Sequence, residues 1–165
     1  MTLIIAPLRF VPDVIKTRSP SHVLTIIGPD TTAPVCSNLN HLTLRANDIV
    51  NATPGLIAPD PILIQSILDF ADIWQRRAPM LIHCLAGISR STAAAYILVC
   101  AATPPGAEDA IAVKLRTASP TATPNLLMVA LADDILERDG AMVMAVKRIG
   151  RGAEAMEGVP FDFVL

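Results

Sequence analysis

Residues 81–92 read Leu81-Ile82-His83-Cys84-Leu85-Ala86-Gly87-Ile88-Ser89-Arg90-Ser91-Thr92 and join an apolar run to an alanine-rich run. The apolar residues 80–82 are typical of a buried strand, and residues 91–99 have the composition of a buried helix. Gly87 permits a tight backbone between them. The segment therefore predicts a strand, a loop large enough for one phosphate, and a helix.

Cys84 and Arg90 stand at the two ends of this loop. Successive backbone N–H groups and a helix N-terminus attract an oxyanion and also stabilise a thiolate, so Cys84 is a candidate nucleophile. The planar guanidinium of Arg90 has the fork of donors needed to hold two phosphoryl oxygens. The candidate phosphate-binding residues are Leu85, Ala86, Gly87, Ile88, Ser89 and Arg90.

The pattern His83-Cys84-x-x-Gly87-x-Ser89-Arg90-Ser91 resembles the HCxxGxSRS form of the CX5R signature of cysteine-dependent protein tyrosine phosphatases, closest to the small dual-specificity type. The resemblance implies that Cys84 attacks phosphorus to form a phosphocysteine and that Arg90 binds the phosphate. It implies that Ser91 donates a hydrogen bond to the departing thiolate. It also implies that His83 shapes the loop by hydrogen bonding.

This chemistry needs a group that protonates the leaving oxygen, which in the phosphatases is a carboxylic acid on a separate loop. Asp48 ends a strand-like segment, begins a loop containing Pro54 and Gly55, and has a chain position similar to that of the family's acid. Asp60 is the other candidate for the acid, but Asp60-Pro61 before a helical run is a typical N-cap arrangement. We favour Asp48 as the acid and Asp60 as the cap.

Pro124-Asn125 resembles the Pro-Asn pair that opens a helix in dual-specificity phosphatases, where the asparagine braces the catalytic loop. An ordinary helix N-cap is the other interpretation of Asn125. Both interpretations remain open on the sequence alone.

The rest of the chain predicts one α/β domain over residues 1–165, with a central mixed sheet and helices on both faces. The tail from about residue 150 is either docked on the domain, in contact with a partner subunit, or flexible and frayed. Trp74 lies on the apolar face of the helix expected at 62–77 and is assigned to the core. Strands are expected at 23–28, 41–44 and 80–82, and further helices at 107–116 and 125–137.

The amino-acid composition limits the classes of partner and the cell compartment that we expect for this protein. Thirteen basic and fifteen acidic residues, without a basic stripe, argue against nucleic acid and anionic membranes as partners. The N-terminus has no positive region before an apolar core, which favours a cytoplasmic protein. Of the three cysteines, Cys100 is expected in the core and Cys36 near a turn. Neither a metal nor another cofactor is expected, because no metal-binding motif is present.

The substrate is less sharply defined. Leu85, Ala86 and Ile88 carry no charge, so we expect a singly phosphorylated substrate, with phosphotyrosine in a protein or small phosphate monoesters favoured. A phosphoinositide or RNA 5′-phosphate phosphatase, a catalytically silent phosphate-binding module and a rhodanese-like thiol enzyme are the alternatives. The oligomeric state stays open.

Overall fold

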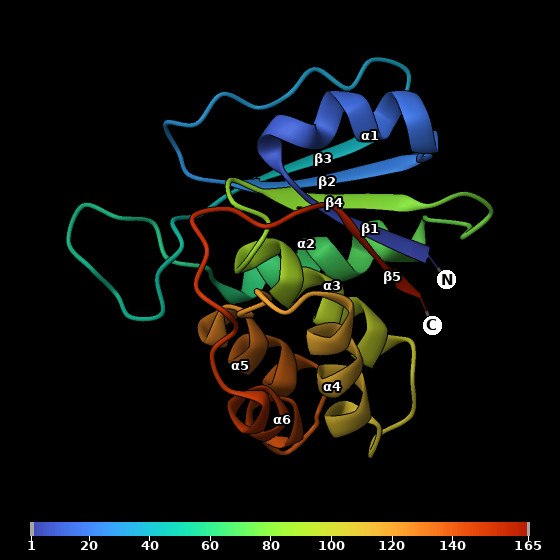
Figure 1. The fold of residues 1–165 in the computed structure, drawn as a ribbon. Coiled ribbons are helices and arrows are strands. Elements are labelled where there is room, and N and C mark those ends of the chain that lie inside the picture. Colours follow the sequence, from blue (N-terminus) through green and yellow to red (C-terminus); the bar gives the residue numbers. More distant parts are fainter. Residues whose placement is uncertain (1, 165) are drawn as a thin grey trace.

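The computed structural model of the protein describes residues 2–164 and is built around a five-stranded sheet (Figure 1). The strands are β1 (Thr2–Pro7), β2 (His22–Ile27), β3 (Asn40–Arg45), β4 (Met80–Cys84) and β5 (Phe161–Val164). Their order is β3-β2-β4-β1-β5, with all neighbours parallel except β5, which is antiparallel to β1. The predicted α/β fold with a mixed sheet is confirmed.

Side chains that alternate along the strands build two separate cores. Ile4, Val23 and Leu81 point to one face and pack with α1, whereas Leu3, Leu24 and Ile82 point to the other face and pack with the remaining helices. Figure 1 shows α1 alone above the sheet and the other helices below it. The helices are α1 (Val11–Arg18), preceded by the short 3-10 helix η1 (Leu8–Phe10), then α2 (Pro61–Asp72), α3 (Arg90–Ala101), α4 (Glu108–Ala118), α5 (Leu126–Ile135) and α6 (Ala141–Ile149).

Helix α2 begins as the sequence predicts but ends earlier. The Asp60 carboxylate accepts a 2.8 Å hydrogen bond from the Leu63 backbone N–H, which confirms Asp60 as the N-cap. The helix ends at Asp72 and not at residue 77, because Arg76 has a left-handed backbone and the Trp74 indole N–H turns back to the Ala78 carbonyl. Trp74 is 3% exposed, so its assignment to the core is confirmed.

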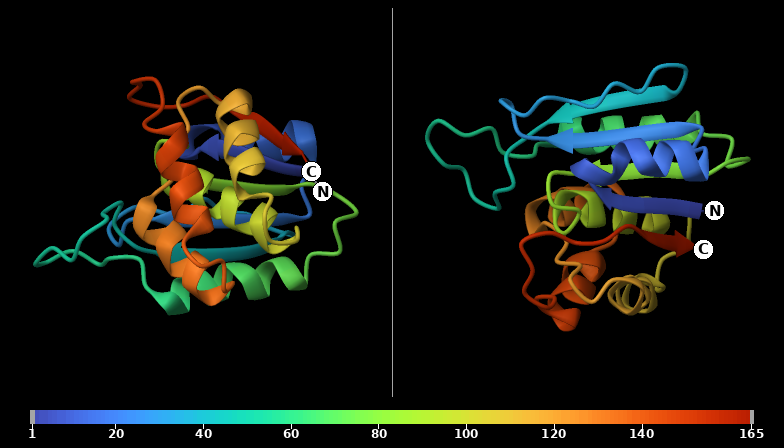
Figure 2. Two further views of the ribbon diagram at one scale, coloured as in Figure 1. Left: turned by 90° about the horizontal axis from the view of Figure 1, so that it is seen from below. Right: turned by 45° about the horizontal axis from the view of Figure 1, so that its top comes forward.

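The sequence pattern predicts no helix or strand at residues 2–7, 11–18 or 141–149 and leaves the tail open. Strand β1 is buried on both faces, so it is an unbroken apolar run without the alternation that identifies a half-buried strand. The tail contributes β5, which pairs with β1 and buries Phe163 against the helical core. The start of β1 and the end of β5 therefore lie side by side (Figures 1 and 2).

The segment between β3 and α2 protrudes beyond one end of the sheet (Figure 2). Its base is closed by two hydrogen bonds, from the Asn47 N–H to the Ile57 carbonyl at 2.7 Å and from the Ile57 N–H to Asn47 Oδ1 at 2.8 Å. Asp48 directly follows this closed base.

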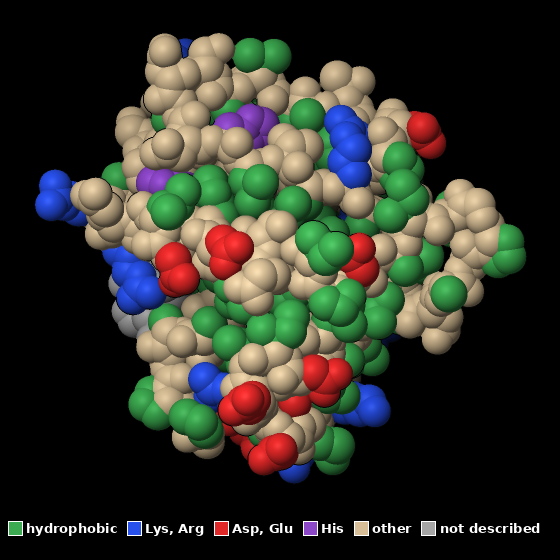
Figure 3. All heavy atoms as spheres, turned by 180° about the vertical axis from the view of Figure 1, so that it is seen from behind, with side chains coloured by type: hydrophobic (Ala, Val, Ile, Leu, Met, Phe, Trp, Pro, Cys, Tyr) green, Lys and Arg blue, Asp and Glu red, His purple; other side chains and the backbone are tan. Residues whose placement is uncertain are grey.

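The surface carries few charges. On the face seen in Figure 3, Lys and Arg side chains lie in ones and twos and do not gather into a basic patch. Within residues 2–164, no helix is both long and apolar enough to cross a membrane.

Candidate active site

The loop between β4 and α3 lies at the carboxyl end of the middle strand of the sheet, where α/β proteins commonly bind ligands. Cys84 is the last residue of β4 and Arg90 the first residue of α3. The predicted strand, loop and helix are thus confirmed. Three separate segments hold the loop by donating backbone hydrogen bonds to its carbonyls. The Leu8 N–H donates to the Leu85 carbonyl at 3.1 Å, the Gly158 N–H to the Ala86 carbonyl at 2.9 Å, and the Thr123 N–H to the Ile88 carbonyl at 2.9 Å.

Gly87 is required by both its backbone and its surroundings. Its φ is +70°, a left-handed conformation that favours glycine. A Cβ on Gly87 would lie 2.7 Å from the Pro7 backbone nitrogen, closer than such atoms approach. Pro7 ends β1 and is the sheet neighbour of Cys84, so the end of β1 supports the loop from beneath.

The Cys84 thiol lies inside the loop and is 1% exposed. The Gly87 backbone N–H points at Sγ with a nitrogen-to-sulfur distance of 3.2 Å, and Ser91 Oγ lies 3.2 Å from the same sulfur. Both groups can donate to a thiolate, which accepts hydrogen bonds more strongly than a thiol. The structure thus places Ser91 beside the sulfur.

Arg90 is 6% exposed, and its guanidinium is fixed in place by a 2.7 Å hydrogen bond from Nη1 to the Ala46 carbonyl. Its Nε lies 3.8 Å from Asp48 Oδ2 and is buried without a hydrogen-bond partner among the described residues. A buried N–H without a partner costs free energy, so this donor is available to an oxyanion in the loop.

The structure brings Asp48 to the loop and leaves Asp60 at the start of α2. Asp48 Oδ1 accepts hydrogen bonds from Ser89 Oγ at 2.7 Å and from Asn125 Nδ2 at 2.8 Å. The second oxygen, Oδ2, faces Arg90. Of the two candidate acids, Asp48 is therefore the one in contact with the loop, while the Asp60 carboxylate is occupied by its own helix.

Asn125 makes contacts that fit both interpretations left open by the sequence. Its Oδ1 accepts from the Met128 N–H at 3.0 Å and caps α5. Its Nδ2 donates to Asp48 Oδ1 and to the Ile49 carbonyl, and its backbone N–H donates to the Ser89 carbonyl at 3.4 Å. A helix cap thus also joins the Asp48 loop to the Cys84 loop.

His83 is fully buried and belongs to a hydrogen-bonded row that crosses three strands. His83 Nε2 lies 2.6 Å from Thr25 Oγ1, and Thr25 Oγ1 lies 2.7 Å from His41 Nε2. Burial lowers the pKa of His83 to about 4, so the ring is neutral at pH 7. Its Nδ1 faces the Cys84 carbonyl at 3.4 Å and acts as a donor, which leaves Nε2 to accept from Thr25.

The motif did not point to Thr25 or His41. The only signal was a hydroxyl in the middle of the apolar strand 23–27, where a buried polar group needs a partner.

The other cysteines lie away from this site in the fold. Cys100 is fully buried in α3, as predicted, and burial raises the pKa of its thiol to about 12. Cys36 is half-buried near a turn, and burial also raises its pKa.

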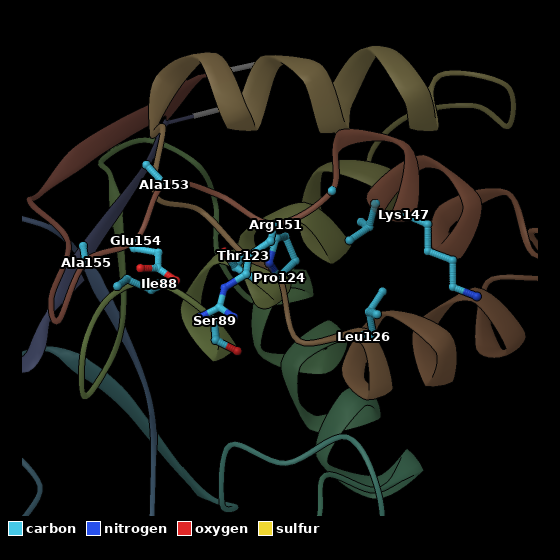
Figure 4. A pocket seen from close by; sticks show the side chains of 12 residues that line it. Ile88, Ser89, Thr123, Pro124, Leu126, Lys147, Arg151, Ala153, Glu154 and Ala155 are labelled. Carbon is cyan, nitrogen blue, oxygen red and sulfur yellow. The ribbon is translucent and has the colours of Figure 1, made fainter.

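Two adjoining cavities flank the loop on its Ser89 side. One, of about 510 Å³, extends toward Asp48 and Asn125, and the other, of about 500 Å³, extends toward Arg151. Figure 4 shows the second cavity, with Ile88 and Ser89 of the loop facing residues of the C-terminal tail. Both cavities are lined by Ser89, Thr123, Pro124 and Leu126, so they are neighbours beside the loop.

The fold of this chain is similar to that of several solved structures. No protein-family model and no curated protein sequence matches the chain. Solved structures do match it. DUSP15 has a TM-score of 0.62 and 20% sequence identity, covering 90% of this chain and 92% of that one. Human DUSP28 has a TM-score of 0.60 and 15% identity, covering 84% and 94%. PTPMT1, solved in complex with PI(5)P, has a TM-score of 0.61 and 14% identity, covering 90% and 94%. The chain has the fold of the small dual-specificity phosphatases.

Proposed function

We propose that the protein is a phosphoric monoester hydrolase of the protein tyrosine or dual-specificity phosphatase type, with Cys84 as nucleophile. The observation that carries the proposal is the arrangement around the Cys84 sulfur, which lies within 3.2 Å of both the Gly87 N–H and Ser91 Oγ. Arg90 and Asp48 lie next to the same loop. A buried structural cysteine has no need of donors aimed at its sulfur.

In the proposed reaction, Cys84 Sγ attacks phosphorus while the bond from phosphorus to the ester oxygen breaks. Asp48 gives its proton to the leaving oxygen, and a phosphocysteine remains. Asp48, now ionised, takes a proton from water, which attacks phosphorus and releases inorganic phosphate and the Cys84 thiolate. Arg90 and the backbone N–H groups of residues 85–90 hold the equatorial oxygens, and Ser91 donates to the departing thiolate.

The loop favours a singly phosphorylated substrate. Leu85, Ala86 and Ile88 bring no charge, so Arg90 is the only cation within residues 84–90. A substrate with several phosphates needs several cations to balance it. We therefore favour phosphotyrosine in a protein, and PTPMT1, which was solved with PI(5)P, supports a phosphoinositide as the second candidate.

The test is the pH dependence of steady-state hydrolysis of a generic aryl phosphate by wild type, Cys84→Ser, Asp48→Asn and Asp60→Asn. We expect no turnover from Cys84→Ser with oxyanion binding retained. Asp48→Asn is expected to lose about two orders of magnitude in kcat and the activity decrease on the basic side of the profile. Asp60→Asn is the matched control, because it changes a carboxylate that caps α2 and does not touch the loop.

Turnover that survives Cys84→Ser would exclude the covalent mechanism. A loss in Asp60→Asn alone would move the acid to Asp60. No wild-type turnover, together with tight binding of phosphopeptide, would favour the silent binding module.

A further inference from the structure

The second cavity beside the Cys84 loop has one wall made by the C-terminal tail. The loop side contributes Ile88 and Ser89, the floor includes Leu126 and Val146, and the tail side includes Arg151 and Glu154. Ile88 and Ser89 belong to the Cys84 loop, so the cavity borders that loop directly and the tail lies across the cavity from it.

The tail is held in this position by a dense set of hydrogen bonds. The Arg116 guanidinium donates to the carbonyls of Ala122, Ile149 and Gly150, each at 2.8 Å. A Cβ on Gly152 would lie 2.6 Å from the Thr121 carbonyl carbon, so the tail backbone runs tightly over the 120–123 loop. Further along, the Gly158 N–H binds the Ala86 carbonyl of the Cys84 loop. The wall is thus prearranged, which lowers the entropic cost of binding.

The side chain of Arg151 is free to meet a ligand. It is exposed and makes no ion pair within residues 2–164, unlike Arg9, Arg18 and Arg148, which pair with acidic side chains. In Figure 4 it points toward Ser89. Lys147 also lines the cavity, and with Glu154 as the only carboxylate there the lining carries a net positive charge. An anionic side chain complements this wall.

We propose that this cavity is a substrate subsite that takes a segment of a phosphoprotein next to its phosphorylated residue, and that Arg151 pairs with an Asp or Glu of that segment. The proposal rests on the proposed phosphatase function and assigns its substrate class. Apolar lining from Ile88, Leu126 and Val146 fits the rest of a peptide chain. The Cys84 loop itself contributes no discrimination of this kind, because its side chains apart from Arg90 are uncharged.

The test uses phosphotyrosine peptides that differ only by Asp or Asn at each of the three positions on either side of the phosphotyrosine. The readout is the ratio of kcat/KM for the Asp and Asn peptides within each protein. We expect wild type to favour Asp at one or two positions by about fivefold, as for a partly exposed ion pair. Arg151→Ala should bring the ratio to one, and Arg151→Glu should bring it below one, because two carboxylates then repel each other.

Arg148→Ala is the matched control, because Arg148 lies near Arg151 in sequence but pairs with Asp109 and does not line the cavity. Equal rates on Asp and Asn peptides at all positions, or an equal loss in Arg148→Ala, would overturn the proposal. So would a preference found only for phosphoinositides with a second phosphate. If wild type hydrolyses no aryl phosphate, the proposed function fails, and the same peptide ratios measured as Kd with Cys84→Ser then decide whether the subsite exists.

Discussion

Replacing His83 by Gln tests whether His83, which precedes Cys84 in β4, is buried in its neutral form. Gln retains an acceptor for the Thr25 hydroxyl, which donates to His83 across 2.6 Å, but it does not titrate. Burial lowers the pKa of His83 from 6.5 to about 4, so the folded protein disfavours the proton that the unfolded chain binds below pH 6.5. The free energy of unfolding therefore falls as the pH drops from 6.5 toward 4. Below pH 4 the protonation of His83 causes no further loss of stability.

The size of this effect follows from the two pKa values. A gap of about 2.5 pH units corresponds to about 3 kcal/mol in total, of which about 2 kcal/mol is lost between pH 7 and pH 5. Urea unfolding at pH 8, 7, 6 and 5 measures it, and Trp74 serves as reporter because it is the only tryptophan and is buried. The difference between wild type and His83→Gln cancels the ionisable groups that do not interact with His83, and His41 is the one histidine that does. Parallel pH profiles within about 0.5 kcal/mol would refute a neutral, buried His83.

Three further substitutions, two of them with a control variant, test packing, capping and a buried ion pair. Gly87→Ala should destabilise the protein by about 2 kcal/mol more than Gly55→Ala in urea unfolding and should lower phosphatase activity, because both glycines have positive φ but a Cβ has open space only at Gly55. Asn125→Ala should cost about 2 kcal/mol and lower kcat, because it removes a helix cap and a contact with the Asp48 loop, whereas Asp60→Ala should cost about 1 kcal/mol and leave kcat unchanged. Arg138→Ala should cost about 3–5 kcal/mol in thermal or urea unfolding, because it leaves the Glu108 carboxylate buried without its 2.7 Å partner.

Each substitution has an outcome that contradicts its reasoning. Equal free energies of unfolding for Gly87→Ala and Gly55→Ala would mean that the Pro7 backbone at the end of β1 leaves room for a Cβ at residue 87. A normal kcat in Asn125→Ala would show that the asparagine only caps α5. A loss below 1 kcal/mol in Arg138→Ala would mean that water reaches Glu108.

The loop that carries Cys84 was predictable because its information is local. Nine consecutive residues contain the proposed nucleophile, the arginine and the glycine, and an apolar run followed by an alanine-rich run specifies a strand and a helix without reference to the rest of the chain. The Asp60 cap was predictable for the same reason, because Asp60-Pro61 and the helix it starts are adjacent in sequence.

The supports of the loop were not predictable, because they come from distant parts of the chain. Gly87 meets Pro7, His83 meets Thr25, and the Ala86 carbonyl meets Gly158. Strand β1 gave no periodic signal because both of its faces are buried, and β5 acquires its partner only when the chain returns to the sheet edge.

The sequence by itself determined that a strand, a short loop and a helix carry Cys84 and Arg90, the residues proposed as nucleophile and phosphate ligand, since a short motif carries its own backbone geometry and reactive groups. Only the tertiary structure decided which groups meet the Asp48 carboxylate. The sequence favoured Asp48 over Asp60 because Asp60-Pro61 has the pattern of a helix N-cap, and the structure adds that Asp48 accepts hydrogen bonds from Ser89 and Asn125, which lie far along the chain. Contacts of that kind depend on how the sheet and helices pack, and no local pattern encodes them.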